Sequence, residues 1–198
     1  MIYSFGNRQT ELVFLREPVP KLDPRIHKSA NKKLHQLDAA VSLDSLGVPP
    51  GNRLEALKGD RKGTFSIRVN DQWRITFLWT SAGPRASDHR GLPLRNAMSE
   101  KLYPPIHPGE ILLEDFIEGF EITQHKLAVS IGVPPRRINE IVHGKRGITA
   151  DTALRLGKYF GVEPIFWMNL QNQYEIEVAE DKALAEIERI QPIQAASA

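Results

Sequence analysis

The side chains best suited to chemistry lie between positions 124 and 146, where residues that can recognise DNA follow one another closely. Arginine can bond guanine O6 and N7 through two donors and asparagine can bond adenine, so Arg136 and Asn139 suit the reading of bases in a major groove. Lys145 and Arg146 lie in a loop between two glycines, where cations can contact phosphates. The candidate DNA-binding residues are Gln124, Pro135, Arg136, Arg137, Asn139, Glu140, His143, Lys145 and Arg146.

Two short helices joined by a tight turn would position these side chains. The sequence predicts helices at 124–131 and 135–142, with Ala128 as the small residue where they cross and Gly132 as a turn residue that can take a positive φ. The residues expected to be buried between the helices are Leu127, Ile131, Val133, Ile138 and Ile141. This spacing is typical of a helix-turn-helix unit. The alternative is that the two arginines form only the solvated face of a structural helix hairpin.

The whole second half of the chain predicts helices. Prolines at first helical positions, threonine or aspartate caps and terminal glycines mark where the segments begin and end. The five expected helices are 110–118, 124–131, 135–142, 150–160 and 164–181. They form an all-α module at 98–182, followed by a tail at 183–198. Phe166 and Trp167 in the last helix serve either a dimer contact or the core.

Residues 104–170 resemble the HigA antitoxins of the Xre-like repressor class. The resemblance rests on PPIHPGEIL at 104–112, GVPPRRINEI at 132–141, GKRGITADTALRL at 144–156 and FWMNLQ at 166–171. It implies a dimer that binds a palindromic operator in its own promoter and represses it. Two half-sites about 34 Å apart on one face of the duplex follow from that symmetry. The alternative is a helical module that only neutralises a partner and dimerises.

The first half of the chain predicts an α+β module, in which two helices lie on a small antiparallel sheet. A helix at 7–16 precedes one at 24–41, where apolar residues recur every three or four positions. The period then changes to two at 64–70 and 73–79, which indicates two half-buried strands joined by a hairpin turn at 70–72. The longer helix carries Ile26, Ala30, Leu34, Leu37 and Val41 on its apolar face, and Lys28, Lys32 and Lys33 off that face.

Charge divides the chain in the same way. Residues 1–97 contain 16 Lys and Arg against 9 Asp and Glu, whereas residues 98–198 contain 10 against 15, which together give the net charge of +2. The asymmetry indicates two modules that attract each other or have different partners, unless it arose by chance. Residues 80–97 have no apolar period and are rich in Gly, Pro and Ser, which predicts a linker after a module at 1–79. Met98 follows the linker and resembles the start of a separate protein.

The N-terminal half is similar to the HigB toxins of the RelE superfamily, the usual partners of HigA. The similar segments are MIYSF at 1–5, RLEALKGDRKG at 53–63 and WRITF at 73–77. The resemblance implies an α+β fold and a ribosome-dependent mRNA endoribonuclease, in which an RNA 2′-hydroxyl attacks the adjacent phosphate with help from an acid, a base and cations. The candidate catalytic residues are Lys58, Arg68, Arg74 and His89. Lys58 matches an active-site lysine of the family, while the arginines alternate off the apolar strand positions; the alternative for each is a surface cation or an ion pair.

The end of the N-terminal half departs from that family, whose toxins finish on a strand with an Asp-Tyr-His type terminus that does acid–base work. Here Asp88-His89 lacks the tyrosine, follows no alternating strand and continues into the linker. We therefore expect an attenuated or inactive toxin module, neutralised by the repressor module fused to it. The alternative is an active nuclease held in check by its fused antitoxin.

Composition excludes several kinds of site. The chain has no cysteine, which rules out disulfides and thiolate metal ligands and fits a reducing cytoplasm. No apolar run is long enough for a transmembrane helix, and the first residues lack the parts of a signal peptide. We expect no metal and no cofactor. The expected partners are operator DNA, the ribosome with its mRNA and a second copy of the chain, with no membrane.

Overall fold

Two capped helices open the N-terminal half. The structure is a computed structural model that describes residues 1–2, 4–20, 22–80, 83–85 and 101–191. Helix α1 (Arg8–Phe14) begins after Asn7, whose side chain accepts an amide of the first turn at 2.8 Å. Helix α2 (Pro24–Ala39) begins after Asp23, which caps it in the same way. Such caps satisfy amides that the start of a helix leaves unpaired. Both predicted helices are confirmed, with ends shorter by one or two residues.

A four-stranded antiparallel sheet packs one face against α2. The strands, in spatial order, are β1 (Glu55–Ala56), β2 (Thr64–Arg68), β3 (Arg74–Thr80) and β4 (Gly83–Arg85). In the predicted hairpin, Phe65 pairs with Phe77 and Ile67 with Ile75. The Asn70 side chain closes the turn by accepting two backbone amides. Three short helical segments complete this half, namely α3 (Leu43–Gly47), η1 (Pro50–Asn52) and η2 (Gly59–Arg61).

Two predicted boundaries are wrong. Strand β4 lies inside the predicted linker at 80–97 and pairs with the end of β3, from Leu78 opposite Arg85 to Thr80 opposite Gly83. The sequence predicted no strand after β3, and this prediction is wrong. The strand found there has three residues, which is too short to produce an alternating pattern. The last helix continues past residue 181 into the predicted tail, because good helix formers such as Ala, Leu and Glu follow without a break.

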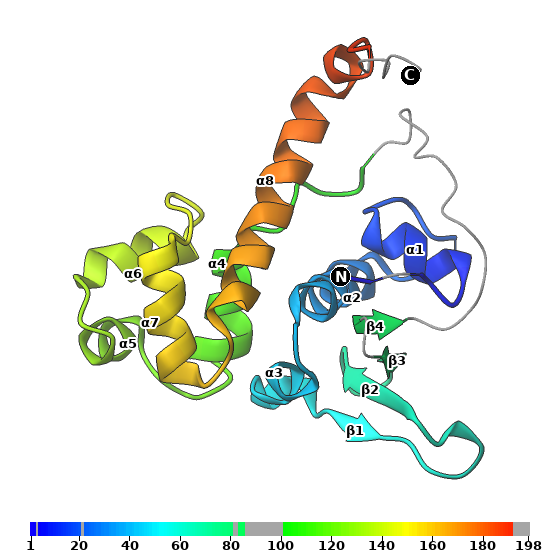
Figure 1. Ribbon diagram of the computed structural model, residues 1–198, viewed down its shortest axis with the longest axis horizontal. Helices are drawn as coiled ribbons and strands as arrows, with labels where there is room; N and C mark the ends of the chain where they lie inside the picture. The colour runs from blue at the N-terminus through cyan, green and yellow to red at the C-terminus, as the bar shows by residue number, and fades with distance from the viewer. Residues whose placement is uncertain (3, 21, 81–82, 86–100, 192–198) are drawn as a thin grey trace, which may run out of the picture.

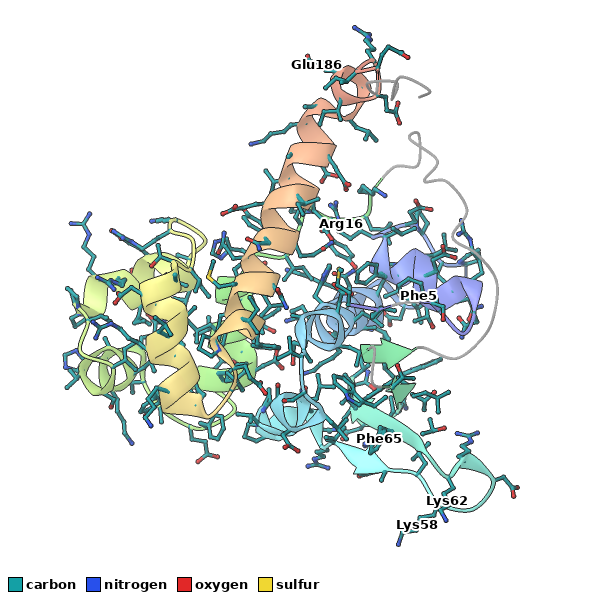
Figure 2. All side chains as sticks on the ribbon, in the orientation of Figure 1. Phe5, Arg16, Lys58, Lys62, Phe65 and Glu186 are labelled. Atoms are coloured by element: carbon teal, nitrogen blue, oxygen red, sulfur yellow. The ribbon has the colours of Figure 1, made fainter. Side chains whose placement is uncertain are left out.

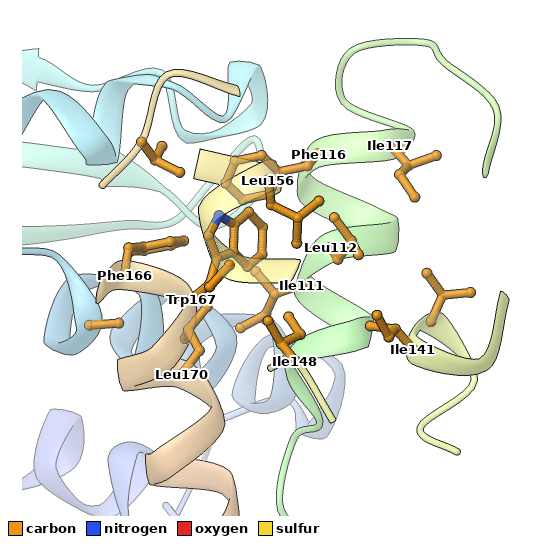
Figure 3. Close-up of a cluster of buried hydrophobic side chains, with 14 of the residues drawn as sticks. Ile111, Leu112, Phe116, Ile117, Ile141, Ile148, Leu156, Phe166, Trp167 and Leu170 are labelled. Carbon is orange, nitrogen blue, oxygen red and sulfur yellow. The ribbon is translucent and has the colours of Figure 1, made fainter. Parts of the chain in front are cut away.

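Every regular element in the described residues of the C-terminal half is a helix. Its elements are α4 (Pro108–Ile111), the π-helical turn η3 (Leu112–Ile117), α5 (Gln124–Ser130), α6 (Pro135–Val142), α7 (Ala150–Phe160) and α8 (Pro164–Ile187). The predicted helix at 110–118 is thus found as α4 running directly into η3. Phe116 and Trp167 meet at the centre of the bundle with ring centroids 4.7 Å apart (Figure 3). Phe166 and Trp167 are fully buried, so they belong to the core of this half.

The helix-turn-helix formed by α5 and α6 has the predicted anatomy. Gly132 takes a φ of +67°, and Ala128 is fully buried where the two helices cross. The residues predicted to lie between the helices are all buried, namely Leu127, Ile131, Val133, Ile138 and Ile141. The Thr123 side chain caps α5 by accepting an amide at 3.0 Å. The whole exposed face of α6 is therefore held by packing on its opposite side.

The two halves share one apolar core. Leu37, Leu46 and Phe77 of the N-terminal half belong to the same buried cluster as Phe116 and Trp167 of the C-terminal half. Helix α2 lies between the sheet and α8, so it packs in both directions (Figure 1). The segments predicted as two modules are therefore packed together within one chain, in addition to their covalent connection.

Candidate nucleic-acid interface

Helix α6 presents a polar face to solvent from a fully buried apolar back. The Arg136 side chain is 88% exposed, and the Arg137 side chain is 30% exposed. Pro135 occupies the first turn, where a missing amide costs nothing, and is also exposed. The structure thus brings the candidate DNA-binding residues of α6 to one surface.

Two carboxylates each bind two arginines on this surface. Glu140 accepts from Arg136 Nε at 2.7 Å and from Arg146 Nε at 2.8 Å. Asp151, in the first turn of α7, accepts from Arg137 at 2.6 Å and from Arg155 at 2.9 Å. The hydrogen bonds from Arg146 and then Arg136 hold the pKa of Glu140 below its ordinary value. The hydrogen bonds from Arg155 and then Arg137 likewise lower the pKa of Asp151, so both carboxylates are ionised at neutral pH.

The remaining candidate residues lie beside Glu140, Asp151 and the arginines that these carboxylates bind. Asn139 donates its amide to Gln124 of α5 at 3.3 Å, which ties the two helices together at the surface. His143 follows α6, and its Nδ1 lies 2.7 Å from the Asn139 carbonyl. Lys145 is exposed in the loop after α6. The sequence-based prediction missed the ion pairs that Asp151 of α7 makes beside this surface, although the i, i+4 spacing of Asp151 and Arg155 on one helix was a usable signal.

Helix α4 fixes the position of α6 from behind. A Cβ placed on Gly109 would lie 1.9 Å from the Ile141 carbonyl oxygen, so only glycine allows this approach. His107 caps α4, since its Nδ1 accepts the Gly109 amide at 2.9 Å. The position of the exposed face of α6 therefore depends on a main-chain contact with a helix that contributes no residue to that face.

Two of the four predicted catalytic residues meet on the sheet. Arg68 and Arg74 are directly opposite each other on β2 and β3. Their neighbours Ile67 and Ile75 pack in the core, so alternation along the strands turns the two arginines to the opposite face. Arg68 binds the side chain of Asp71, whereas Arg74 binds Glu55 at 3.3 Å and donates to the Arg53 carbonyl at 2.6 Å. Each arginine thus has a local carboxylate that offsets the repulsion between them.

Lys58 lies apart from that pair. It is exposed just before η2, at the far end of the sheet from α8 (Figure 2). His89 falls outside the described residues. Among the residues that the structure describes, no group of three His, Asp or Glu side chains could hold a metal ion.

Lysines of α2 face the acidic turn of the C-terminal half. Lys28 binds Glu110 at 2.8 Å, and Lys32 and Lys33 form ion pairs with neighbouring carboxylates of η3. Gln36, one turn further along, donates to Asp115 at 2.8 Å. These lysines, predicted to lie off the apolar face, are there, but two of them are buried by the other half of the chain. The opposite charges of the halves therefore meet in a direct interface.

A second, more deeply buried ion cluster joins the turn after α1 to α2 and α8. Arg16 is buried, with its Nε 3.1 Å from Glu177 and two bonds of 2.9 Å to Asp181. His35 Nε2 lies 3.5 Å from Glu177 Oε1 without forming a hydrogen bond. Burial, partly offset by Asp38, lowers the pKa of His35 to about 4, so its ring is neutral at neutral pH. Only the overall charge asymmetry hinted at this cluster in the sequence.

Comparisons with known proteins divide the chain at the same place. The model of the HigB-like, RelE-like toxin of type II toxin–antitoxin systems matches residues 14–86, and a helix-turn-helix model matches residues 114–167. The toxin HigB-1 of Vibrio cholerae is 50% identical over 80 residues, covering 40% of this chain and 84% of the relative. The virulence-associated protein I of Dichelobacter nodosus is 52% identical over 77 residues, covering 39% of this chain and 71% of the relative.

A solved structure is similar to the second half. The Pseudomonas aeruginosa antitoxin HigA with the higBA promoter is 43% identical, covers 46% of this chain and 99% of that one, and has a TM-score of 0.44. In the described part of this chain, no helix is both long and apolar enough to cross a membrane.

Proposed function

Because this chain belongs to the HigB toxin family through its first half and joins that half to a HigA-type helix-turn-helix unit, we propose that it is an operator-binding repressor of its own promoter. The observation that carries the proposal is the exposed cationic face of α6, held on a helix-turn-helix with Gly132 at its turn. Arginine on such a helix reads guanine, and the loop cations after α6 are placed for phosphates. Since promoter DNA lies in the bacterial cytoplasm, the proposal places the protein there.

A dimer is part of the proposal. Paired recognition helices bind half-sites one helical turn apart, about 34 Å, and a two-fold protein matches a palindromic operator. Each copy would then carry its own toxin-like half to the DNA. Sedimentation of the full chain, alone and with a promoter duplex, tests this stoichiometry.

Replacing Arg136 with alanine tests the recognition face. Loss of one two-donor arginine contact to guanine costs about 1–3 kcal/mol, so we expect affinity for the promoter duplex to fall about 10- to 100-fold. The measurement is fluorescence anisotropy of a labelled promoter duplex, with a scrambled duplex beside it. Circular dichroism should stay unchanged, since Arg136 is 88% exposed.

Arg8→Ala is the matched control for that variant. Arg8 is also exposed and binds a carboxylate on its own helix, Glu11, at 2.9 Å, but it lies in the other half. We expect its promoter affinity to match that of the unsubstituted protein. If Arg136→Ala bound the promoter as tightly as Arg8→Ala does, α6 would not be the recognition helix.

We also propose that the toxin-like half is neutralised within the chain and attenuated as a nuclease. The docking contacts of α2 with the C-terminal half support neutralisation, because they add bulk to the small toxin-like half on the side of α2 away from the sheet. Attenuation is supported by the engagement of Arg68 and Arg74 with local carboxylates and by the missing terminal tyrosine. Lys58 remains exposed, so we do not propose that the C-terminal half neutralises the toxin-like half by covering this lysine.

Expression of the full chain tests this second part. We expect no codon-phased mRNA cleavage and no growth arrest after induction, because the attached half keeps the toxin-like half out of the ribosome. Mapping of mRNA 5′ ends measures the cleavage, and Lys58→Ala serves as the reference. Cuts that appear with the unsubstituted chain and vanish with Lys58→Ala would establish an active nuclease instead.

A further inference from the structure

Glu140 is a carboxylate on the proposed recognition face, where it lies between two arginines. It lies one turn after Arg136 on α6, and its side chain is only 20% exposed. Both of its oxygens are used, one by Arg136 and the other by Arg146 from the loop beyond the helix. A helix surface that served only to attract phosphates would gain nothing from a carboxylate at this position.

The bonds of Glu140 to Arg136 and Arg146 weaken the binding of this face to DNA that lacks the operator sequence. Phosphates attract Arg136 and Arg146, but withdrawing them leaves Glu140 ionised beside a polyanion. The ordinary pKa of a glutamate lies well below neutral pH, so Glu140 does not take up a proton when its two arginines leave it. When DNA offers only phosphates, the two arginines exchange their charge-assisted hydrogen bonds to Glu140 for similar bonds to phosphates. The exchange also adds repulsion between Glu140 and the DNA backbone.

A suitable base sequence removes that penalty. The exocyclic amine of cytosine is a major-groove donor, and carboxylate side chains accept from it. A cytosine opposite Glu140 would return one N–H donor to the carboxylate, while Arg136 turns to guanine and Arg146 to a phosphate. We propose that Glu140 is a specificity-determining residue, which releases its two arginines at low cost only where a cytosine amine takes their place. This inference rests on the proposed operator binding and adds the base class that the helix selects.

Asp151 supplies the matched comparison. It also binds two arginines, Arg137 and Arg155, and its removal changes the net charge by the same amount. However, it belongs to α7, and its side chain is 53% exposed. Removing Asp151 should therefore strengthen binding to all duplexes alike, as any added positive charge does.

The test compares Glu140→Gln with Asp151→Asn in the full-length protein. The probes are a duplex of its own promoter and a scrambled duplex of equal length and composition, measured by anisotropy at several salt concentrations. We expect Glu140→Gln to bind the scrambled duplex several-fold more tightly and to lose at least about tenfold in the ratio of promoter to scrambled affinity. Asp151→Asn should leave that ratio within about twofold.

Base preference gives the second readout. Selection from a duplex pool randomised across the promoter footprint should show a cytosine at one position of each half-site, and Glu140→Gln should lose that cytosine. An equal ratio for Glu140→Gln and Asp151→Asn, or a cytosine preference that survives Glu140→Gln, overturns the inference. Failure of the unsubstituted protein to distinguish the promoter from the scrambled duplex would instead overturn the proposed function, so the two failures are separable.

Discussion

Gly109→Ala is expected to destabilise the protein by about 3 kcal/mol, the upper part of the range for overpacking a well-packed core. The added Cβ would lie 1.9 Å from the carbonyl oxygen and 2.7 Å from the carbonyl carbon of Ile141. Both are main-chain atoms of α6, so they cannot move aside as the end of a flexible side chain can. The gain of about 1 kcal/mol that alanine brings to a helix relative to glycine is smaller than this clash.

The same substitution should weaken promoter binding. Ile141 is in the last turn of α6, so the shift that accommodates Gly109→Ala displaces the proposed recognition helix. Urea unfolding followed by tryptophan fluorescence gives the stability, and anisotropy gives the affinity. Gly51→Ala is the control, because a Cβ there meets no atom within 4 Å, and its effect should stay within about 0.5 kcal/mol. Equal stabilities of the two variants would contradict the close contact between α4 and α6.

The parts of this fold that the sequence predicts well are those set by local spacing. Gly132 predicts the turn because glycine can take a positive φ. The helical spacing of Ile138 and Ile141 within a short segment predicts their burial. The strands of the hairpin follow from alternation over seven residues. In contrast, β1 and β4 are too short to carry a period, and their pairing with β2 and β3 is decided by the rest of the sheet.

The interface between the halves could not be predicted in detail for a different reason. Lys33 and Asp115 are 82 positions apart, and a helical pattern shows only that the lysine lies off the apolar face of its own helix. The opposite charges of the two halves indicated attraction but not which residues meet. The same holds at the candidate site, where the bond from Arg136 to Glu140 follows from i, i+4 spacing, whereas the bond from Arg146 depends on the path of a loop.

Arg16→Met should weaken the contact between the two halves and lower the free energy of unfolding by about 3–5 kcal/mol. This is the usual cost of removing one partner of a buried ion pair. Arg16 is 3% exposed and binds Glu177, Asp181 and the Tyr103 carbonyl, all of them in the C-terminal half. Methionine fills much of the volume but leaves Glu177, also buried, without its cation. Urea unfolding of the full chain measures the loss. Arg25→Met is the control, since Arg25 is 91% exposed beside Asp23 and should change stability by less than about 1 kcal/mol.

A double substitution distinguishes lost attraction from a stranded charge. If the cost of Arg16→Met comes from leaving Glu177 buried and uncompensated, then adding Glu177→Leu removes the stranded carboxylate. The double variant should therefore be more stable than the sum of the two single effects predicts, by about 1–3 kcal/mol. Additive effects would mean that Arg16 acts through Asp181 and the Tyr103 carbonyl alone. An Arg16→Met variant as stable as Arg25→Met would mean that the two halves do not dock through this cluster in solution, and neutralisation within the chain would lose its structural basis.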